Sequence, residues 1–336
     1  MTRFKLINNK VLFAVCTVLL TVLIVGCPEK ASSTGNNDLD DDQKPIENPT
    51  TKIALHVTDN RAEGVRKVLG LLDFPSMAGK NVVVKPNFNT ADPSPASTHN
   101  ETLEQIMTEI HSRGAVGITL AERSYQAFDE VIAQKAIDVL ADEKNFRIVN
   151  LDNDEYILFE KEGLHWRNGF RVPRTISESE YIVATCCLKT HHTGVITMSL
   201  KLGVGILPRS HMQELHSSSR INSMIAEINL AYKPDIIILD GVKAFIEGGP
   251  SRGTVATGNV ILAGTDRIAV DVVGAAMLEY LGSTKVRKGS IFDLEQIQRA
   301  VELNLGIKYP SQIEIVTDDS ASAALADELK AIIDEG

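Results

Sequence analysis

The stretch Asp235-Ile-Ile-Ile-Leu-Asp-Gly241 decides the fold, because four consecutive apolar residues stand between two acidic ones. A strand with one face in water alternates apolar and polar residues, whereas a strand buried on both faces is apolar throughout. Asn81-Val-Val-Val-Lys85 has the same uninterrupted character. Burial of both faces is typical of a parallel sheet with helices on each side. These two stretches therefore predict the α/β class of fold.

Short β-rich runs alternate with amphipathic stretches along most of the chain. The expected strands lie at residues 53–57, 81–85, 117–121, 147–150, 181–188, 235–240, 259–263 and 313–316. The expected helices lie near residues 60–72, 99–113, 127–141, 218–231, 267–281, 292–303 and 321–334. Within residues 154–172, Tyr156-Ile-Leu-Phe159 and Phe170-Arg-Val172 flank a glycine and indicate a hairpin. The prediction is a mainly parallel sheet flanked by helices, with a small hairpin insertion.

The first 26 residues are typical of an export signal. Three basic residues within the first ten precede an apolar run over residues 11–25, which ends at Gly26-Cys27. This order resembles a lipobox, in which a small residue precedes a cysteine that becomes lipidated. Residues 1–26 are therefore the predicted lipoprotein signal peptide and Cys27 the predicted lipidation site. A short uncleaved anchor with an incidental cysteine is the alternative.

Lipidation predicts a protein of the bacterial cell envelope that is extracytoplasmic and anchored to a membrane through the lipid on Cys27. Pro28 follows the cysteine, and the absence of Asp there favours the outer membrane in a Gram-negative cell. Residues 27–51 are small, polar and acidic, so they predict a flexible acidic tether. Residues 52–336 then form the α/β domain.

The formal net charge of −10, from 44 acidic and 34 basic residues, makes the chain a poor match for nucleic acid. No two of the four cysteines have CxxC spacing, so neither a disulfide framework nor a cysteine-rich metal cluster is expected. Cys186 and Cys187 stand inside an apolar run, where buried free thiols are expected. The predicted partners are a membrane and a small anionic molecule.

Polar and charged residues gather where the predicted strands end. In open parallel sheets, ligands bind beyond the carboxyl ends of the strands. The residues at five of these ends are Lys85-Pro-Asn87, Glu122-Arg123, Lys189-Thr-His-His192, Asp240-Gly241 and Thr265-Asp266. If the strands end at one edge of the sheet, these side chains converge in one pocket.

Three of these residues are predicted catalytic groups. Lys85 and Lys189 would hold an anion beside His191, which would donate or accept a proton. Neighbouring strand residues point to opposite sides of a sheet, so at most one of His191 and His192 is expected to face the cleft. Lysines that simply reach solvent at strand ends are the alternative.

Further residues are predicted to bind the ligand or a metal. The predicted ligand-binding residues are Asn87, His99, Lys201, Arg209, Gly248 and Gly249. Cations within an acidic chain favour a carboxylate or phosphate ligand, and glycines let the backbone approach it. Asp240 and Asp266 would orient His191 or hold a divalent metal. Asp266 also stands where it would cap the helix near 267–281.

Taken in order, these residues resemble the DUF362 family of uncharacterised proteins. The matching segments are Val84-Lys-Pro-Asn87, Thr98-His99, Leu188-Lys-Thr-His191, Ser199-Leu-Lys201, Leu239-Asp-Gly241, Glu247-Gly-Gly-Pro250 and Ala263-Gly-Thr-Asp266, continuing to Asp271. They cover most of the body of the chain. Some relatives carry ferredoxin-like cysteine clusters, which this chain lacks, so no iron–sulfur cluster is expected. The resemblance implies a site but no particular reaction.

Three functions fit this pattern. The first is a membrane-tethered extracytoplasmic enzyme that acts on a small anionic substrate, with or without the help of a divalent metal. The alternative is a lipoprotein receptor that binds a small anionic ligand without turnover. The third is a structural or assembly lipoprotein, which would have the same residues scattered over its surface. Replacing His191 separates the first two, because turnover needs a proton carrier and binding does not.

Overall fold

The computed structural model describes residues 50–287 and 289–335. The predicted signal peptide, Cys27 and nearly all of the predicted tether lie outside this described part. No helix within it is long and apolar enough to cross a membrane.

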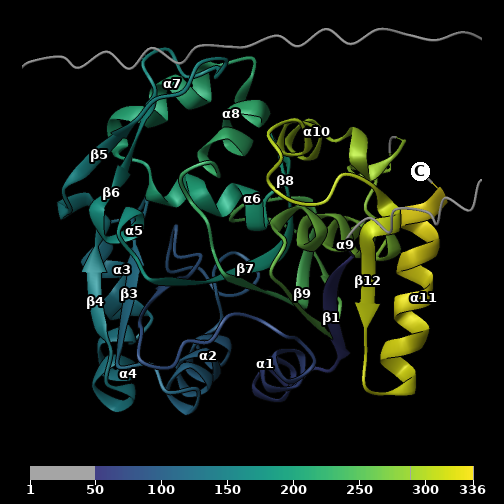
Figure 1. Ribbon diagram of the computed structural model, residues 1–336. Helices are drawn as coiled ribbons and strands as arrows, with labels where there is room; N and C mark the ends of the chain where they lie inside the picture. Colours follow the sequence, from purple (N-terminus) through teal and green to yellow (C-terminus); the bar gives the residue numbers. More distant parts are fainter. Residues whose placement is uncertain (1–49, 288, 336) are drawn as a thin grey trace, which may run out of the picture. The chain divides into compact units, whose positions relative to one another are not determined.

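A ten-stranded sheet forms the centre of the fold (Figure 1). Its strands are β1 (Thr51–Val57), β2 (Asn81–Lys85), β3 (Gly117–Glu122), β4 (Arg147–Asn150), β7 (Tyr181–His191), β8 (Val195–Ile196), β9 (Ile236–Gly248), β10 (Gly253–Thr257), β11 (Val260–Gly264) and β12 (Ile313–Val316). The order is β12-β1-β11-β9-β7-β2-β3-β4, and β10 and β8 pair with β9 and β7. Five of the seven pairs along this order are parallel, which confirms the predicted α/β class and mainly parallel sheet.

Helices cover both faces of this sheet. On one face lie α1 (Arg61–Gly70), α2 (Asn100–Ser112), α3 (Phe128–Gln134) and α4 (Ile137–Lys144), with α1 and α2 at the bottom of Figure 1. The other helices are α5 (Arg174–Ser177), α6 (Ser199–Leu202), α7 (Met212–Ser217), α8 (Ile221–Ile228), α9 (Arg267–Tyr280), α10 (Glu295–Glu302) and α11 (Ser320–Glu335). Apolar residues of these seven helices pack into a second core on the opposite face.

The uninterrupted apolar strands serve both cores at once. Val82 and Val84 of β2 belong to the core beneath α1 and α2, whereas Val83 belongs to the core beneath α9. In β9, Ile236 and Ile238 belong to the core beneath α1 and α2. Ile237 and Leu239 belong to the core beneath α9. Because side chains alternate between the faces of a strand, both sets are removed from water.

The predicted hairpin insertion is confirmed as a separate two-stranded antiparallel sheet of β5 (Tyr156–Phe159) and β6 (Phe170–Pro173). Phe170 is buried, and its ring lies 5.0 Å from that of Phe159 and 5.5 Å from that of Trp166. These rings dock the insertion on the core beneath α8.

One strand reverses the expected arrangement. β11 runs antiparallel to both of its neighbours, β1 and β9. Its carboxyl end, which leads to Asp266, therefore lies at the edge opposite to the carboxyl ends of β2, β3 and β7. The polar residues that follow these strands thus divide between two edges of the sheet.

Candidate functional site

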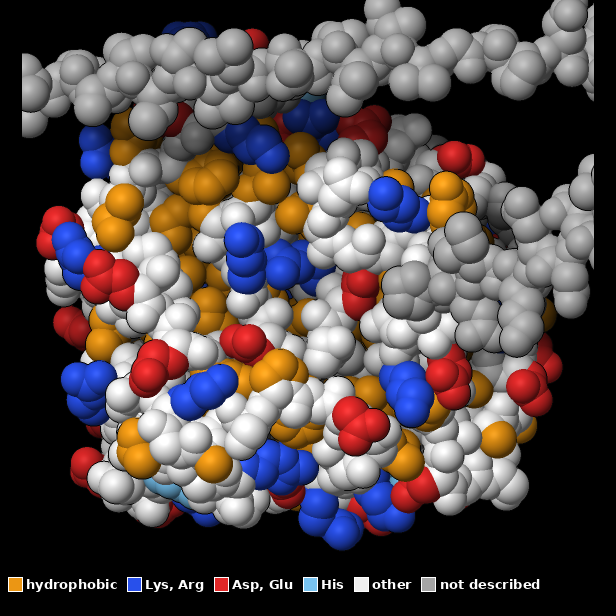
Figure 2. Space-filling model, in the orientation of Figure 1, with side chains coloured by type: hydrophobic (Ala, Val, Ile, Leu, Met, Phe, Trp, Pro, Cys, Tyr) orange, Lys and Arg blue, Asp and Glu red, His pale blue; other side chains and the backbone are white. Residues whose placement is uncertain are grey.

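A cavity of about 790 Å³ lies beyond the carboxyl ends of β2, β3 and β7. Six Lys or Arg side chains and three histidines line it, against two carboxylates. These residues are Lys85, Arg123, Lys189, Lys201, Arg209, Arg252, His191, His192, His216, Asp92 and Glu122. Figure 2 shows Lys and Arg side chains gathered near the centre of one face, in a hollow bordered by apolar side chains. The excess of positive charge favours an anionic ligand.

Lys85 and Glu122 form a buried ion pair at the base of the cavity. Lys85 Nζ lies 2.7 Å from Glu122 Oε1 and donates a hydrogen bond to the Pro86 carbonyl at 2.8 Å. The backbone N–H groups of Phe88 and Arg123 donate to the same carboxylate at 2.9 and 2.8 Å. Burial lowers the pKa of Lys85, and the charge of Glu122 opposes that shift.

Gly205 packs closely against this pair. A Cβ atom at Gly205 would lie 2.8 Å from Lys85 Nζ and 3.0 Å from Glu122 Oε1. Both distances are shorter than ordinary van der Waals contact, so any larger residue would push against the pair. Gly205 stands in the short 3-10 helix Gly203–Ile206, directly after α6.

Lys189, near the end of β7, is buried and is held by backbone oxygen atoms. Its Nζ donates to the Ala96 carbonyl at 2.6 Å and to the Pro250 carbonyl at 3.3 Å. Burial lowers the pKa of Lys189. No carboxylate in the described part of the chain lies within ion-pair distance of it, so its positive charge is not neutralised by a neighbour.

Lys201 and Arg123 make no ion pair or side-chain hydrogen bond through their charged groups within residues 50–287 and 289–335, although the charges of Asp152 and Glu122 lie near Arg123. Arg123 is only 6% exposed, and its Nε is buried without a hydrogen-bond acceptor. Burial lowers the pKa of Arg123. Burial and the nearby charge of Lys189 lower the pKa of Lys201 to about 8. Both side chains line the cavity, so a bound anion could supply the missing partner.

The three histidines of the cavity differ in which ring nitrogen carries the proton. His191 Nδ1 accepts hydrogen bonds from the N–H groups of Thr193 and Gly194, both at 3.1 Å, so its proton is on Nε2. Burial, followed by the charge of Lys201, lowers the pKa of His191 to about 2. His192 and His216 instead donate from Nδ1 to backbone carbonyls, which leaves Nε2 as an acceptor.

Both His191 and His192 line the cavity, which corrects the expectation that at most one would do so. Their rings stack with centroids 4.5 Å apart. The alternation argument fails because β7 ends at His191, and His192 stands in the turn to β8. His192 is fixed there by its 2.9 Å hydrogen bond to the Gly249 carbonyl.

Asp271 positions the helix that carries Lys201. Its carboxylate is buried in α9 and accepts hydrogen bonds from the N–H groups of Ser199 at 2.7 Å and Leu200 at 3.0 Å. Asn229 holds the same turn, because its Nδ2 donates to the Leu200 carbonyl at 2.9 Å. Burial raises the pKa of Asp271 to about 7.

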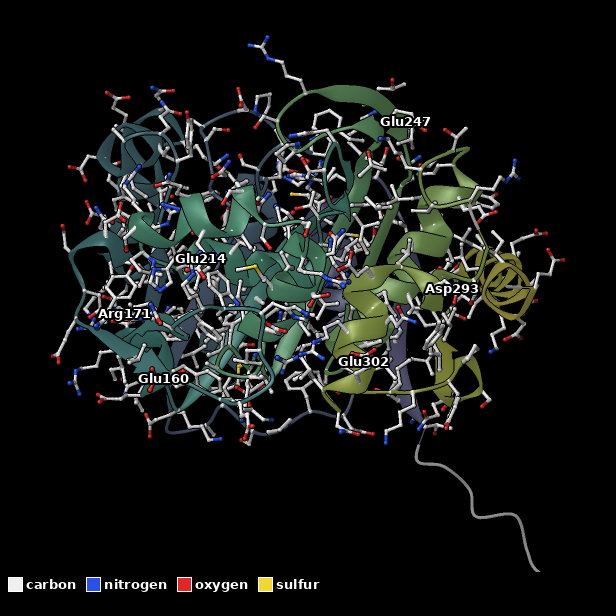
Figure 3. The ribbon with its side chains drawn as sticks, turned by 90° about the horizontal axis from the view of Figure 1, so that it is seen from above. Glu160, Arg171, Glu214, Glu247, Asp293 and Glu302 are labelled. Carbon is white, nitrogen blue, oxygen red and sulfur yellow. The ribbon has the colours of Figure 1, made fainter. Side chains whose placement is uncertain are left out.

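The hairpin insertion supports the segment that covers the cavity. His211 Nε2 accepts from the N–H of Arg171 in β6 at 3.1 Å, and Glu214 of α7 accepts from the N–H of Arg167 at 2.9 Å. Figure 3 shows Glu214 of α7 next to the hairpin that carries Arg171. Met212 and His216 of the same segment line the cavity.

Six of the predicted site residues meet at the cavity, namely Lys85, Asn87, Lys189, His191, Lys201 and Arg209. Asn87 Nδ2 donates to the Ala96 carbonyl at 3.1 Å and so shapes the loop that contacts Lys189. Arg209 is 52% exposed and lies 2.9 Å from Asp152, so its charge is partly neutralised at the rim.

His99 and the two glycines do not line the cavity themselves. His99 is the N-cap residue of α2, and its Nδ1 accepts from the N–H of Glu101 at 3.3 Å. Gly248 ends β9, and Gly249 begins the turn to β10. A Cβ atom at Gly249 would lie 2.0 Å from the Thr190 carbonyl oxygen, so only glycine allows this turn to approach β7. The turn brings Pro250, Ser251 and Arg252 to the cavity.

Asp240 and Asp266 lie apart and have different partners. Asp240 is fully buried, and its Oδ2 accepts from Arg61 Nε at 2.8 Å and from Thr102 Oγ1 at 2.7 Å, which joins β9 to α1 and α2. Asp266 caps α9, as its position predicted, and accepts from Ile307 N at 2.7 Å. Neither residue lines the cavity.

One group of three potential metal ligands occurs among the described residues, formed by His56, Asp318 and Asp319. Lys67 Nζ already contacts the Asp318 carboxylate at 2.5 Å, and Asp319 accepts from Ser322 at the start of α11. None of the three residues lines the cavity.

Sequence reasoning missed several residues that the cavity uses. Glu122 and Arg123 were visible at a strand end but were given no role. Arg252 follows the Gly-Gly-Pro turn, which was a signal for it. His216 and Gly205 had no such signal, because their positions depend on how the segments after α6 fold back over β2 and β3.

Comparison with known proteins gives a family, one protein of similar sequence and one solved structure. A family model described as "Domain of unknown function (DUF362)" matches residues 82–276. A thylakoid-associated protein of a Synechocystis strain is 25% identical over 153 residues, which are 44% of this chain and 48% of that protein. The chain thus matches about half the length of this relative. The lactate racemase apoprotein from Thermoanaerobacterium thermosaccharolyticum is 10% identical, with a TM-score of 0.39, over 84% of this chain and 86% of that one.

Proposed function

The chain belongs to the DUF362 family. We propose that it is a membrane-tethered extracytoplasmic enzyme that acts on a small organic anion in the cavity. The observation that carries the proposal is the pair of unpartnered cationic side chains, Lys201 and Arg123. The Arg123 guanidinium is buried without an ion pair, which costs several kcal/mol, and an anionic ligand would remove that cost. The half-buried Lys201 adds a second positive charge to the same cavity.

The remaining lining favours an organic anion over a bare inorganic ion. Met198, Leu202, Val204 and Met212 supply apolar surface beside the cations. Ligand sites of this kind combine apolar walls with a few polar groups that fix orientation. The ligand class is therefore an acid with a carboxylate or phosphate group and an apolar portion.

The cavity also holds groups that could move a proton. His191 carries its proton on Nε2, so it would donate a hydrogen bond to an oxygen of the ligand. The Lys85–Glu122 pair, which lines the same cavity, would accept or return a proton. The divalent metal predicted at Asp240 and Asp266 is not part of this proposal, because Arg61, Thr102 and backbone amides already engage those carboxylates.

A receptor that binds the same anion without turnover is the second candidate, and one observation favours it. His191 Nδ1 accepts hydrogen bonds from two backbone N–H groups, and burial lowers the pKa of the ring to about 2, so the ring is a poor proton carrier near neutral pH. His191→Gln tests this, because glutamine keeps a hydrogen-bond donor and removes the titrating ring. Turnover should be lost with affinity kept in the enzyme, and a receptor would show no turnover in either form.

The membrane attachment rests on Cys27, which lies outside the described residues. The arrangement of basic, apolar and small residues before Cys27 supports it. Labelled palmitate should enter the wild-type chain and not a Cys27→Ala variant. Equal labelling of the two would contradict the lipid anchor.

Native mass spectrometry of the full-length chain in a mild detergent tests the anion site. An organic acid should copurify with the wild-type protein and be lost from the Arg123→Met variant. Recovery of the same acid from both proteins would place its site elsewhere.

A further inference from the structure

We propose that Lys201 is the nucleophilic amine of this cavity, and that the substrates are small organic acids with a ketone or aldehyde carbonyl, which it binds covalently as an imine. The inference deepens the proposed function and rests on it, because the same cavity has to hold the carboxylate of the acid. It assigns to Lys201 a covalent role beyond charge attraction.

The fold fixes the position of Lys201 through its neighbours on α6. This helix has four residues, too few to be stable through its own hydrogen bonds. Asp271 holds its first two N–H groups, and Asn229 holds the Leu200 carbonyl. The side chain of Lys201 therefore starts from a rigid point and lines the cavity.

Of the three lysines that line the cavity, Lys201 has the free amine. Lys85 is paired with Glu122 and also bonds the Pro86 carbonyl. Lys189 bonds two carbonyls. Lys201 Nζ has no hydrogen bond or ion pair in the described part of the chain. An amine attacks a carbonyl through its lone pair, so an amine without a partner is best prepared to react.

The surroundings of Lys201 favour the neutral amine. Its pKa of about 8 leaves roughly one amine in ten neutral at pH 7, against roughly one in 3,000 for an ordinary lysine. Lys189 is the nearby like charge that adds to the effect of burial. The other charged or titratable side chains of the cavity are Lys85, Asp92, Glu122, Arg123, Arg209, Arg252, His191, His192 and His216. Cations predominate among them.

The covalent step balances without any further reagent. The lone pair of Lys201 Nζ attacks the carbonyl carbon, and one proton of the amine moves to the carbonyl oxygen, which His191 Nε2–H can hold by a hydrogen bond. The second amine proton then joins the hydroxyl, which leaves as water. One C=N bond replaces one C=O bond, and a borohydride reagent can reduce it to a stable secondary amine.

The carboxylate of the acid would contact Lys189 or Arg123, whose guanidinium makes no ion pair or side-chain hydrogen bond in the described part of the chain. The apolar portion would lie against Met198 and Leu202. A 2-oxo acid places its carbonyl next to its carboxylate and so suits this arrangement. Pyruvate and the larger phenylpyruvate are suitable probes.

The test is reductive trapping on the full-length chain in detergent, with sodium cyanoborohydride and either oxo acid, followed by mass mapping of the peptides. Lactate is the matched control acid, because it has the carboxylate and no ketone. Lys201→Arg keeps the positive charge and removes the amine. Lys233, which is exposed and outside the cavity, reports nonspecific alkylation.

We expect Lys201 to gain the mass of the oxo acid minus one oxygen atom, with at least about tenfold more label than Lys233. Lys201→Arg should bind the acid, as measured by titration calorimetry, without being labelled there. Binding of the acid with no excess label at Lys201 would overturn the imine and leave the anion site standing. Absence of binding for both oxo acids and lactate would overturn the proposed function together with the imine.

Discussion

Replacing Lys201 by methionine should make the protein more stable and a weaker binder of anions. The Lys201 side chain is half-buried, and its ammonium has no ion pair among the described residues, so removing it leaves no carboxylate unpaired. Methionine has a similar length and suits the neighbouring Met198 and Leu202. Exchanging buried charges for apolar residues of similar volume is neutral or stabilising by about 1–4 kcal/mol, so we expect a gain of about 1 kcal/mol or more.

Lys85→Met is the matched control, because it removes a lysine of the same cavity that does have a partner. It leaves the carboxylate of Glu122 buried and unpaired, which should cost about 3–5 kcal/mol. Urea unfolding, followed by the fluorescence of the single buried tryptophan, Trp166, measures both changes in the free energy of unfolding.

The pH dependence of this gain has a definite sign. The folded-state pKa of Lys201 is about 8, below its ordinary value of 10.5. The folded state therefore loses the proton first, and the cost of burying the charge falls as the pH rises from 8 towards 10.5. The stability difference between the variant and the wild type should be largest below pH 8 and narrow above it.

The loss of affinity should be about 10- to 100-fold, because a hydrogen bond to a charged group contributes about 1.5–3 kcal/mol. Titration calorimetry with pyruvate measures it. If Lys201→Met unfolds as easily as Lys85→Met and binds the acid as tightly as the wild type, the reasoning about unpartnered cations is refuted.

Three further predictions follow from contacts around the same cavity. Gly205→Ala should weaken acid binding at least about tenfold in calorimetry, because its methyl group would displace Lys85 Nζ; unchanged affinity would contradict the close approach. Asp271→Ala should lower the free energy of unfolding in urea by about 1–3 kcal/mol, because two buried N–H groups of α6 lose their acceptor. It should also weaken binding of the acid. Loss of stability with intact affinity would show that α6 does not position Lys201. The rate of reductive trapping should rise with pH to a midpoint near the Lys201 pKa of about 8 and then level off. Lys189→Met should move this midpoint to higher pH, because it removes a like charge. A pH profile that Lys189→Met leaves unchanged would argue against the coupling of the two lysines.

The class of fold followed from the sequence because a strand that is buried on both faces has an uninterrupted run of apolar residues. Val82, Val83 and Val84 divide between two cores, and this is why the run is apolar without interruption. The direction of a strand relative to its neighbours has no comparable residue pattern. The reversal of β11, which removes Asp266 from the site, depends on a strand order that apolar patterns do not encode.

The site was predictable where the relevant residue ends a parallel strand. Lys85, Lys189 and His191 are such residues, and they meet at the cavity. Asp240 also ends a parallel run, but its side chain turns towards Arg61 and Thr102. A sequence shows that a carboxylate is present, whereas its partner is set by tertiary packing across distant segments.

Titration calorimetry of one acid against its uncharged amide tests the central claim most directly. Pyruvate and pyruvamide have the same carbonyl and nearly the same shape, and they differ in the negative charge. We expect the wild-type protein to bind pyruvate at least about tenfold more tightly than pyruvamide, and the Arg123→Met, Lys201→Met double variant to bind both equally. Equal affinities for the two compounds in the wild-type protein would contradict an anion site built on unpartnered cations.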